Sequence, residues 1–449
     1  MPLRPEDLEN CPTLTEHGQR MLDFLREHPA APRFGDRSGN RLLAGEVDEL
    51  RAFVRDVQAA DIGWPAGGKP DWLAAHVARM FREVPACRAL GQPPARFEDL
   101  PTLRRADLAA DIARFVPDDV PVDRLINFRT TGTTGNPLLI ASHPVVAARY
   151  LAFHLRALKR FGIEPRHGRG QVGVVLLGLQ RRCFTYVSVT PLMDDSGLAK
   201  INLHPDDWRS PDDRATYLDA LAPEVIAGDP ISFGELLRLP LATRPRALLS
   251  VGMTLSRGLR DALQARFGCP VLDLYSMNEA GPIAVHDEAA GGHVLLQPAL
   301  YVEILGPDDQ PVPEGERGEV TLTGGFNFCL PLLRYRTGDR AALRHGPAGP
   351  VLVDLHGRAP VRFRTAAGTW VNNIDVTHAL HPWPLTQYAL HQAADGALRL
   401  RLAPGAAPHE AAVRAALGAL LGDLPLVVET LVADDKVLQY TSALEPSAG

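Results

Sequence analysis

The stretch Arg129-Thr130-Thr131-Gly132-Thr133-Thr134-Gly135-Asn136-Pro137 decides how the rest of the chain is interpreted. Backbone N–H groups and hydroxyls in such a loop can bind an anion, and glycine lets the backbone approach the anion's oxygen atoms closely. Phosphate is the natural ligand for a loop of this kind. It is not a Walker A loop, because no Gly-Lys-Ser/Thr follows at the required spacing. A purely structural turn between a strand and a helix is the alternative, so the surrounding sequence has to decide.

The composition predicts a globular protein with a large core. Of the 449 residues 45% are apolar, and a chain of this length favours about two to three domains. The formal net charge is −6 and no run of lysine or arginine occurs, which argues against a nucleic-acid partner. Basic residues are almost all arginine, and the lysines are Lys69, Lys159, Lys200 and Lys436.

The cysteines and the N-terminal residues favour a cytoplasmic protein. Five scattered cysteines without a Cys-x-x-Cys motif suit a reducing compartment better than a disulfide framework; they are Cys11, Cys87, Cys183, Cys269 and Cys329. The first residues lack an apolar signal core, and no apolar run is long enough to span a bilayer. We therefore expect no membrane partner.

Apolar runs alternate with helical periodicity along the middle of the chain. The predicted strands are 125–128, 172–177, 225–228, 247–252 and 271–275. A helix is expected after Ser142 as its N-cap and another over 256–267, while residues 1–100 look helical, with segments near 46–60 and 71–84. Strands alternating with helices indicate an α/β sheet, in which ligands lie at the carboxyl ends of the strands.

The last third of the chain changes character. Short strands separated by Pro-Asp-Asp, Pro-Glu-Gly-Glu and Gly-Gly turns predict a β-rich subdomain over 300–345. About ninety residues remain after Gly357, with strand–helix–strand patterning that suits one small α+β domain. The predicted fold is thus an α/β protein with a large N-terminal α/β domain, residues 1–355, and a small C-terminal α+β domain, residues 356–449.

Four motifs stand in the order and spacing of adenylate-forming (AMP-binding) enzymes. They are the Thr130–Pro137 loop, Tyr275-Ser276-Met277-Asn278-Glu279, Tyr335-Arg336-Thr337-Gly338-Asp339 and Gly357-Arg358. Residues 100–108, which read Leu-Pro-Thr-Leu-Arg-Arg-Ala-Asp-Leu, are similar to the corresponding segment of the phenylacetate–CoA ligase-like branch. The chain resembles this family from about residue 95 to the end.

The resemblance implies an AMP-forming carboxylate ligase. Such an enzyme uses ATP and Mg²⁺ to convert a small carboxylic acid, with an aromatic acid as one candidate, into an acyl-adenylate and pyrophosphate. Transfer to CoA, a carrier protein or an amine would follow. Bringing anions together requires positioning and charge neutralisation. The small C-terminal domain would be mobile, and a homo-oligomer is compatible with the family.

The resemblance also implies the nucleotide site. Phosphates would be held by Thr130, Thr131, Gly132, Thr133, Thr134 and Gly135, with Thr134 counted among the catalytic residues. Glu279 would ligate Mg²⁺, which prefers hard oxygen donors, and Asp339 would accept both ribose hydroxyls. Tyr275 would stack on adenine; the remaining candidates are Gly252, Met253, Asp273, Ser276, Asn278 and Arg358. A surface glutamate, a hairpin turn and a core tyrosine are the respective structural alternatives for Glu279, Asp339 and Tyr275.

Lys436 lies where this family places a catalytic lysine near the chain end. It is the only lysine after Lys200, and a flexible point charge differs from the planar fork of arginine. Some positions depart from the family pattern: Asn136 replaces a common lysine, and Ser276 and Asn278 replace Gly and Thr. Ala359 and Pro360 follow Arg358 where a hinge aspartate is usual, so adenylation is predicted while the acceptor stays open.

His286, His293 and Cys329 are candidate zinc ligands, because imidazole and thiolate suit Zn²⁺. The alternative is two loop histidines and a buried cysteine. A metal-dependent hydrolase built on His286 and His293 would lack the carboxylate spacing of a metalloprotease motif. A different class of function is a non-catalytic nucleotide-binding or interaction protein on a degenerate ligase scaffold. Retention of Lys436 together with Glu279 favours the enzyme.

Overall fold

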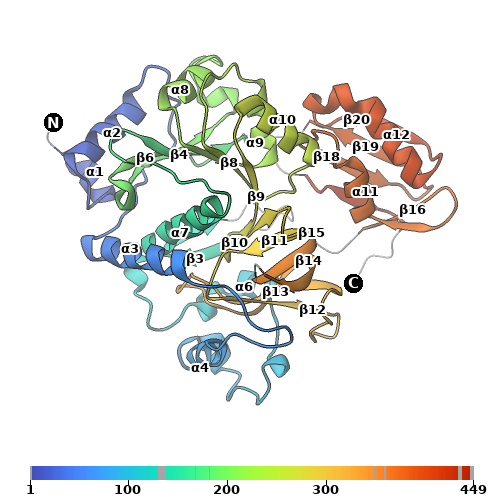
Figure 1. Ribbon diagram of the computed structural model, residues 1–449, viewed down its shortest axis with the longest axis horizontal. Coiled ribbons are helices and arrows are strands. Elements are labelled where there is room, and N and C mark those ends of the chain that lie inside the picture. Colours follow the sequence, from blue (N-terminus) through green and yellow to red (C-terminus); the bar gives the residue numbers. More distant parts are fainter. Residues whose placement is uncertain are drawn as a thin grey trace.

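The computed structural model describes residues 3–129, 138–166, 168–181, 183–347, 349–357, 361–432 and 437–444. These residues form a sheet of thirteen strands flanked by helices, and a separate four-stranded sheet near the C-terminus (Figure 1). The predicted α/β class is confirmed. No helix of the described ranges is both long and apolar enough to cross a membrane.

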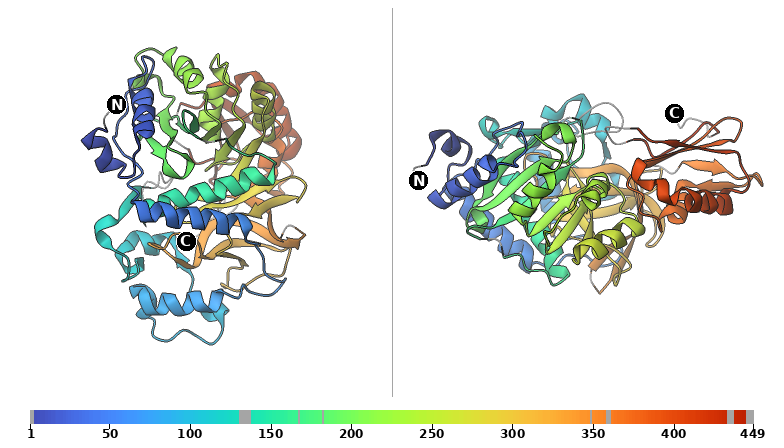
Figure 2. Two further views of the ribbon diagram at one scale, coloured as in Figure 1. Left: turned by 60° about the vertical axis from the view of Figure 1, so that its left-hand side comes forward. Right: turned by 90° about the horizontal axis from the view of Figure 1, so that it is seen from above.

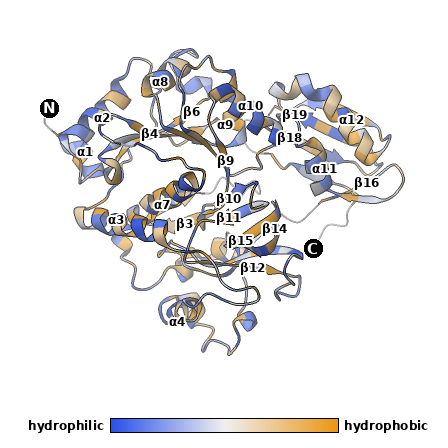
Figure 3. Cartoon of the chain, viewed as in Figure 1, coloured by the Kyte–Doolittle hydropathy of each residue, from blue (hydrophilic) through white to orange (hydrophobic). Residues whose placement is uncertain are grey.

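The centre of the large sheet is parallel. Its neighbouring strands, in spatial order, are β6 (Ser196–Asn202), β4 (Val172–Gly178), β7 (Val225–Gly228), β8 (Ala247–Val251) and β9 (Val271–Met277). β5 (Tyr186–Thr190) pairs antiparallel with β6. Both faces of these strands are covered, which explains why they read as continuous apolar runs. Figure 3 shows these central strands as largely hydrophobic and the outer helices as mixed.

Helices pack on both faces of the parallel strands. One face is covered by α2 (Glu16–Glu27), α8 (Asp213–Leu221), α9 (Pro230–Arg238) and α10 (Arg257–Phe267), whose apolar residues share a core with Val175 and Leu248. The other face is covered by α7 (Pro144–Arg160), which lies beside α3 (Ala44–Ala59) (Figure 2). The predicted helices near 46–60 and over 256–267 are confirmed.

The N-cap of α7 is His143, so the prediction of Ser142 is wrong by one residue. Ser142 is the last residue of β3 (Leu139–Ser142), which pairs with β2 (Ile126–Arg129) on the other side of the glycine-rich stretch. Pro144 occupies the first helical position, which suits a residue without an N–H, and the His143 side chain accepts a hydrogen bond from the Val145 N–H.

The β-rich region continues the same sheet rather than forming a second one. Beyond β9 the order is β10 (Gly281–Asp287), β11 (Gly292–Leu295), β15 (Gly349–His356), β14 (Leu332–Gly346), β13 (Arg317–Gly324) and β12 (Leu300–Leu305), all antiparallel. The two-residue strand β1 (Leu103–Arg104) lies parallel to β14, opposite Tyr335 and Arg336. This pairing connects the N-terminal region to the candidate site.

The first hundred residues are helical, as predicted. Besides α2 and α3 they form α1 (Pro5–Asn10), α4 (Leu73–Glu83) and α5 (Pro85–Arg88), and α6 (Arg105–Ala110) follows β1. α4 lies at the bottom of Figure 1, where Met80 and Phe81 share a small core with Leu100 and Leu333. The segment before β1 is therefore packed against β14.

The C-terminal sheet has its own hydrophobic core. Its strand order is β20 (Leu426–Thr430), β19 (Leu398–Leu402), β18 (Tyr388–Gln392) and β21 (Tyr440–Ser442), accompanied by α11 (Asn373–Leu380), α12 (Glu410–Leu421) and the hairpin β16 (Arg362–Arg364)–β17 (Trp370–Asn372). Along β19 leucines are buried and arginines exposed, as on a sheet covered on one face. The division of the chain at residue 356 stays a prediction.

The loop after α11 contacts the first turn of α10. The Arg257 N–H donates to His381 Nδ1 (3.1 Å) and the Gly258 N–H donates to the His381 carbonyl (3.2 Å). A Cβ at position 258 would lie 2.4 Å from the Pro382 oxygen, so the close approach requires glycine. The loop thus satisfies N–H groups that a helix start leaves without an internal partner.

Candidate functional site

One turn and one strand of the large sheet bring the predicted magnesium and ribose residues near each other. Glu279 lies in the turn between β9 and β10, and Asp339 lies on β14. Tyr275, near the end of β9, donates its hydroxyl hydrogen bond to Asp339 Oδ2 at 2.8 Å. Burial and the Asp339 charge raise the pKa of Tyr275, so its hydroxyl remains the donor.

Glu279 is a buried carboxylate with two donors on the same oxygen. Arg105 Nη1 lies 2.9 Å from Oε1, and the Tyr335 hydroxyl lies 3.1 Å from it. Only 5% of Glu279 is exposed, which is low for an acidic side chain and excludes the alternative of a solvated surface glutamate. Burial, followed by the Glu279 charge, raises the pKa of Tyr335 and brings that of Tyr150 to about 12.

Asp339 lies in an irregular part of β14, where the register with β13 shifts, and this part is held by its own backbone and by Glu319. Gly338 has φ of +84°, and its N–H donates to Glu319 Oε1 at 3.0 Å. The Asp339 N–H donates to Thr337 Oγ1 at 3.1 Å, and Thr337 in turn donates to the Val320 carbonyl. Arg336 forms ion pairs with Glu319 and Asp309. Hydrogen bonds from residues 337–339 to β13 and to each other therefore fix the backbone that carries the Asp339 carboxylate.

The predicted purine residues lie at the carboxyl ends of neighbouring strands. Asp273 lies on β9 opposite Ser250 of β8, and Gly252 and Met253 directly follow β8. Burial raises the pKa of Asp273 to about 7, against the opposing charge of Arg260. Ser276 is partly buried on β9, while Asn278 is exposed in the turn before Glu279. Asp273 is thus positioned two residues before Tyr275 on one strand.

Several predicted residues lie outside the described ranges. They are Thr130, Thr131, Gly132, Thr133, Thr134, Gly135, Asn136, Arg358, Pro360 and Lys436. The described neighbours of the first group are β2 and β3, which flank it. Gly357, the residue before Arg358, lies beside Asp339, since a Cβ on Gly357 would be 3.5 Å from Asp339 Oδ1.

The predicted zinc site is not supported. His286 and His293 are cross-strand neighbours on β10 and β11 with ring centroids 5.1 Å apart. Burial lowers the pKa of both and brings that of His293 to about 3, so the pair is neutral. Cys329 lies in the core beside α7, with its thiol pKa raised to about 12 by burial. In the described part of the chain no three His, Cys, Asp or Glu side chains form a group that could hold a metal.

Arg105 and Tyr335 are site residues that motif reading did not assign. Both lie within quoted motifs, but their contact with Glu279 depends on the parallel pairing of β1 with β14. A two-residue strand has no periodicity that a sequence pattern could detect. The available signal was the high content of basic residues directly before Asp107.

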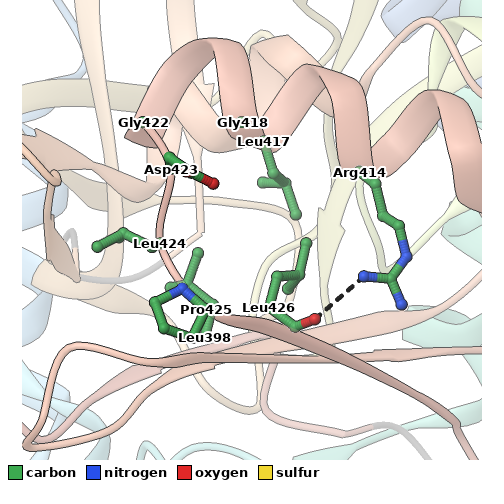
Figure 4. Close-up of a pocket in the computed structure, with 9 residues that line it drawn as sticks. All are labelled: Leu398, Arg414, Leu417, Gly418, Gly422, Asp423, Leu424, Pro425 and Leu426. Carbon is green, nitrogen blue, oxygen red and sulfur yellow. Dashed lines mark hydrogen bonds between the residues drawn. The ribbon is translucent and has the colours of Figure 1, made fainter.

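Cavity size does not locate this cluster. A cavity of about 620 Å³ lies against β20 in the C-terminal sheet, where Arg414 donates to the Leu426 carbonyl at 3.0 Å (Figure 4). A second, of about 270 Å³, lies between α3 and α7, lined by Phe53, Phe153 and Phe326. Neither is lined by Glu279, Tyr275 or Asp339. The site is therefore identified by its polar contacts.

Sequence comparison identifies the central segment. The model of the family described as AMP-binding enzyme matches residues 125–328. Phenylacetate-coenzyme A ligase of Escherichia coli (strain K12) is 33% identical over 97 residues, which cover 21% of this chain and 22% of that protein. The same enzyme of Aromatoleum evansii is 34% identical over 92 residues, covering 20% and 21%. The matched segment thus spans about a fifth of these relatives.

Structure comparison extends the likeness to most of the chain. A crystal structure of 2-hydroxyisobutyryl-CoA ligase in the postadenylation state, in complex with R3-HIB-AMP, has a TM-score of 0.59. The match covers 88% of this chain and 90% of that one at 17% identity, so it shows the fold alone. Residues 125–328 therefore match the AMP-binding enzyme family, and the chain resembles the phenylacetate–CoA ligase-like branch of adenylate-forming enzymes.

Proposed function

We propose that the protein activates a carboxylic acid with ATP. A carboxylate oxygen of the acid attacks the α-phosphorus, the bond to the bridging oxygen breaks, and pyrophosphate leaves with the electron pair. An acyl-adenylate remains. The observation that carries the proposal is that Glu279 and Asp339 each accept a hydrogen bond from a tyrosine, and that Asp339 lies near enough to Tyr335 for its charge to raise the pKa of that residue. The match of residues 125–328 to the AMP-binding enzyme family supports the same proposal.

ATP and Mg²⁺ fit the donors of this cluster. Glu279 offers a hard carboxylate oxygen, and because both of its hydrogen-bond donors reach Oε1, we assign Oε2 to the cation. Mg²⁺ bound there would supply positive charge to phosphate oxygens. We assign the ribose hydroxyls to Asp339, because a carboxylate is a hydrogen-bond acceptor at both of its oxygens.

The remaining roles follow from the family and stay proposals. The loop Thr130–Gly135 would hold the phosphates and Arg358 would complete the nucleotide site. Lys436 would reach the α-phosphate from a small C-terminal domain, residues 356–449, that moves relative to residues 1–355. Its cation would act chiefly as negative charge concentrates in the transition state, so Lys436→Ala should reduce adenylation on the order of 10²-fold while ATP affinity changes little.

The activities of the relatives favour CoA as the acceptor and an aromatic acid as the substrate class. Two relatives are phenylacetate-coenzyme A ligases, and the structural neighbour is a CoA ligase. Pro360 fixes φ in the segment where the family rotates its small domain. We therefore propose slow transfer to CoA, with an amine or a carrier protein as the competing acceptor.

Acid-dependent pyrophosphate release tests the proposal. The purified chain is incubated with ATP, Mg²⁺ and a panel of aryl and alkyl acids, with and without CoA. We expect release that requires both an acid and Mg²⁺ and that disappears in Asp339→Ala. ATP binding without release for any acid would instead favour the non-catalytic nucleotide-binding protein.

A further inference from the structure

Arg334 of β14 is a fully buried arginine whose side chain leaves the regular alternation of its strand. Its side chain is 0% exposed and its φ is +45°, a left-handed conformation that a residue with a Cβ rarely adopts. The β13–β14 register shifts between Leu322 and Gly324, and the Arg334 N–H donates to Thr323 Oγ1 at 2.9 Å. A bulge of this kind re-aims a side chain.

The re-aimed guanidinium binds backbone carbonyls from two other segments. Nη1 donates to the carbonyls of Glu98 and Leu100, each at 2.6 Å, and Nη2 donates to that of Asp309 at 2.7 Å. Phe97 adds a ring face 5.7 Å from the guanidinium carbon. The planar guanidinium presents its N–H donors in a fixed geometry that reaches carbonyls of two separate segments, whereas a lysine ammonium is a compact point charge on a flexible stem. Arg334 therefore fixes the backbone of residues 98–100.

The fixed segment leads directly to the donors on Glu279. Three residues after Leu100, β1 pairs with β14, so that Leu103 lies opposite Tyr335 and Arg104 opposite Arg336. The next residue, Arg105, and the strand partner Tyr335 are the two groups that donate to Glu279 Oε1. Both donors thus depend on the alignment of the same two strands, and Arg334 lies next to Tyr335.

Stability alone does not account for Arg334. Its charge is balanced by Glu303 of β12, whose Oε2 lies 3.5 Å from Arg334 Nε, and Glu303 is also buried. Within the described residues neither Glu303 oxygen nor Arg334 Nε has a hydrogen-bond partner. Replacing a buried ion pair by apolar residues is often neutral or stabilising. The buried Arg334–Glu303 pair costs desolvation free energy, yet Arg334 makes three contacts with backbone carbonyls. This combination points to a positioning role.

We infer that Arg334 is a positioning residue for acid activation: through the carbonyls of Glu98 and Leu100 it aligns β1 on β14 and so orients Arg105 and Tyr335 on Glu279. The catalytic consequence rests on the proposed function, whereas the alignment itself rests on the contacts alone. Two independent measurements separate these parts.

The test uses the double variant Glu303→Gln/Arg334→Gln. It removes the guanidinium that binds the three carbonyls, and it removes the opposing carboxylate as well, so that no unbalanced buried charge is left. Hydrogen–deuterium exchange is measured for residues 98–105, and kcat and KM by pyrophosphate release. We expect exchange in this segment to rise about tenfold or more, and kcat to fall on the order of 10²-fold with a smaller change in the KM for ATP. Arg334→Lys keeps the positive charge opposite Glu303. We expect its stability to be close to that of the parent, while hydrogen exchange in residues 98–105 stays faster than in the parent.

Two control variants exclude other causes. Arg344→Gln removes an exposed arginine from the same strand. Val320→Ala shortens a fully buried side chain of β13 whose carbonyl is not one of those that Arg334 binds. The first should behave as the parent, and the second should lower stability without accelerating exchange in residues 98–105 selectively.

The outcomes distinguish the inference from the function it serves. Parental exchange in the double variant overturns the alignment. Faster exchange with unchanged kcat overturns the catalytic consequence. If the parent itself releases no pyrophosphate with any acid, the proposed function fails, while the exchange of residues 98–105 still decides whether Arg334 aligns β1.

Discussion

At the scale of single residues, the cluster depends on two carboxylates that are each held by a tyrosine hydroxyl. Tyr335 donates to Glu279 and Tyr275 donates to Asp339. Arg105 adds a cation to Glu279 at 2.9 Å. The tyrosine bonds orient the carboxylates without neutralising them, because the raised pKa values of both hydroxyls keep their protons in place. Each carboxylate thus accepts a hydrogen bond from a tyrosine that keeps its proton.

Glu279→Gln tests the carboxylate as a cation ligand. The amide keeps the size of the side chain but removes its charge, so we expect Mg²⁺-dependent pyrophosphate release to fall on the order of 10²-fold or more. Release is measured across a Mg²⁺ titration. Glu288→Gln, an exposed glutamate after β10, is the matched control and should titrate as the parent does. Equal turnover in Glu279→Gln and in the control would remove the metal assignment.

Tyr275→Phe tests the support of Asp339. The ring stays, but the donor at 2.8 Å is lost, and one hydrogen bond to a charged group contributes about 1.5–3 kcal/mol. We expect ATP binding to weaken and its preference over 2′,3′-dideoxy-ATP to shrink, with a larger effect in Asp339→Ala; calorimetry with both nucleotides measures this. Tyr217→Phe removes a buried hydroxyl that donates to the Leu25 carbonyl far from the cluster, and should bind ATP normally.

The sequence motifs predict the carboxylates of the site better than the residues that hold them in place. The family motifs predict Glu279, Tyr275 and Asp339 in one nucleotide site. They do not predict Arg105, since its contact spans 174 sequence positions and passes through a two-residue strand. The predicted zinc site is unsupported for a related reason: His286 and His293 meet across two strands, but Cys329 lies in the core beside α7. Sequence spacing does not reveal which face a side chain occupies.

At the scale of elements, apolar runs predicted the strands well and their connections poorly. The runs near 172, 225, 247 and 271 all became neighbouring parallel strands, because burial on both faces requires continuous apolar sequence. The turn-rich sequence of residues 300–345 predicts a separate β-rich subdomain. In the structure, β10–β15 instead extend the large sheet through antiparallel pairs. Strand order depends on pairing between distant segments, which local patterns do not encode.

Glu303 of β12 should make stability depend on pH. Burial raises its pKa from 4.5 to about 7 despite Arg334. Below the unfolded pKa both states are protonated; as pH rises from there to 7, the unfolded chain loses this proton first, so the folded state binds more protons and stability falls. The total loss is on the order of 3 kcal/mol at 1.36 kcal/mol per pKa unit.

Comparison of the parent with Glu303→Gln isolates this effect. The glutamine variant has no carboxyl proton at this position, so the difference in stability, parent minus variant, should fall between pH 5 and pH 8. Urea unfolding midpoints at several pH values measure it, and the constant offset from the lost ion pair does not affect the slope. Identical pH slopes in the two proteins would contradict the assignment.

At the scale of the whole molecule, the segment that leads into the C-terminal sheet packs on α9 and α10, which cover the large sheet. The loop 381–384 lies on the first turn of α10, where His381 accepts two backbone N–H bonds. Thr386 lies against Gly234 of α9, where a Cβ would come within 2.2 Å of its methyl group. Two glycines, each without room for a methyl group, thus allow residues 381–386 to lie close against α9 and α10.

Gly258→Ala should loosen this contact while leaving both sheets intact. The added methyl would lie 2.4 Å from the Pro382 carbonyl oxygen, which is backbone and cannot rotate away. We expect faster amide exchange at Arg257 and Gly258 and in residues 378–386, and a larger radius of gyration by X-ray scattering. Gly418→Ala on α12, where a Cβ meets nothing within 4 Å, is the control. Unchanged exchange in Gly258→Ala would show that the loop adapts without separating.

β14 carries the carbonyl clamp Arg334, the Glu279 donor Tyr335 and the Asp339 carboxylate within six consecutive positions of one strand. A strand presents alternate residues to opposite faces, so inserting or deleting one residue would reverse the facing of every later side chain. Among natural relatives of this chain, length differences should therefore collect at the two ends of β14, and alignments should show none between positions 334 and 339.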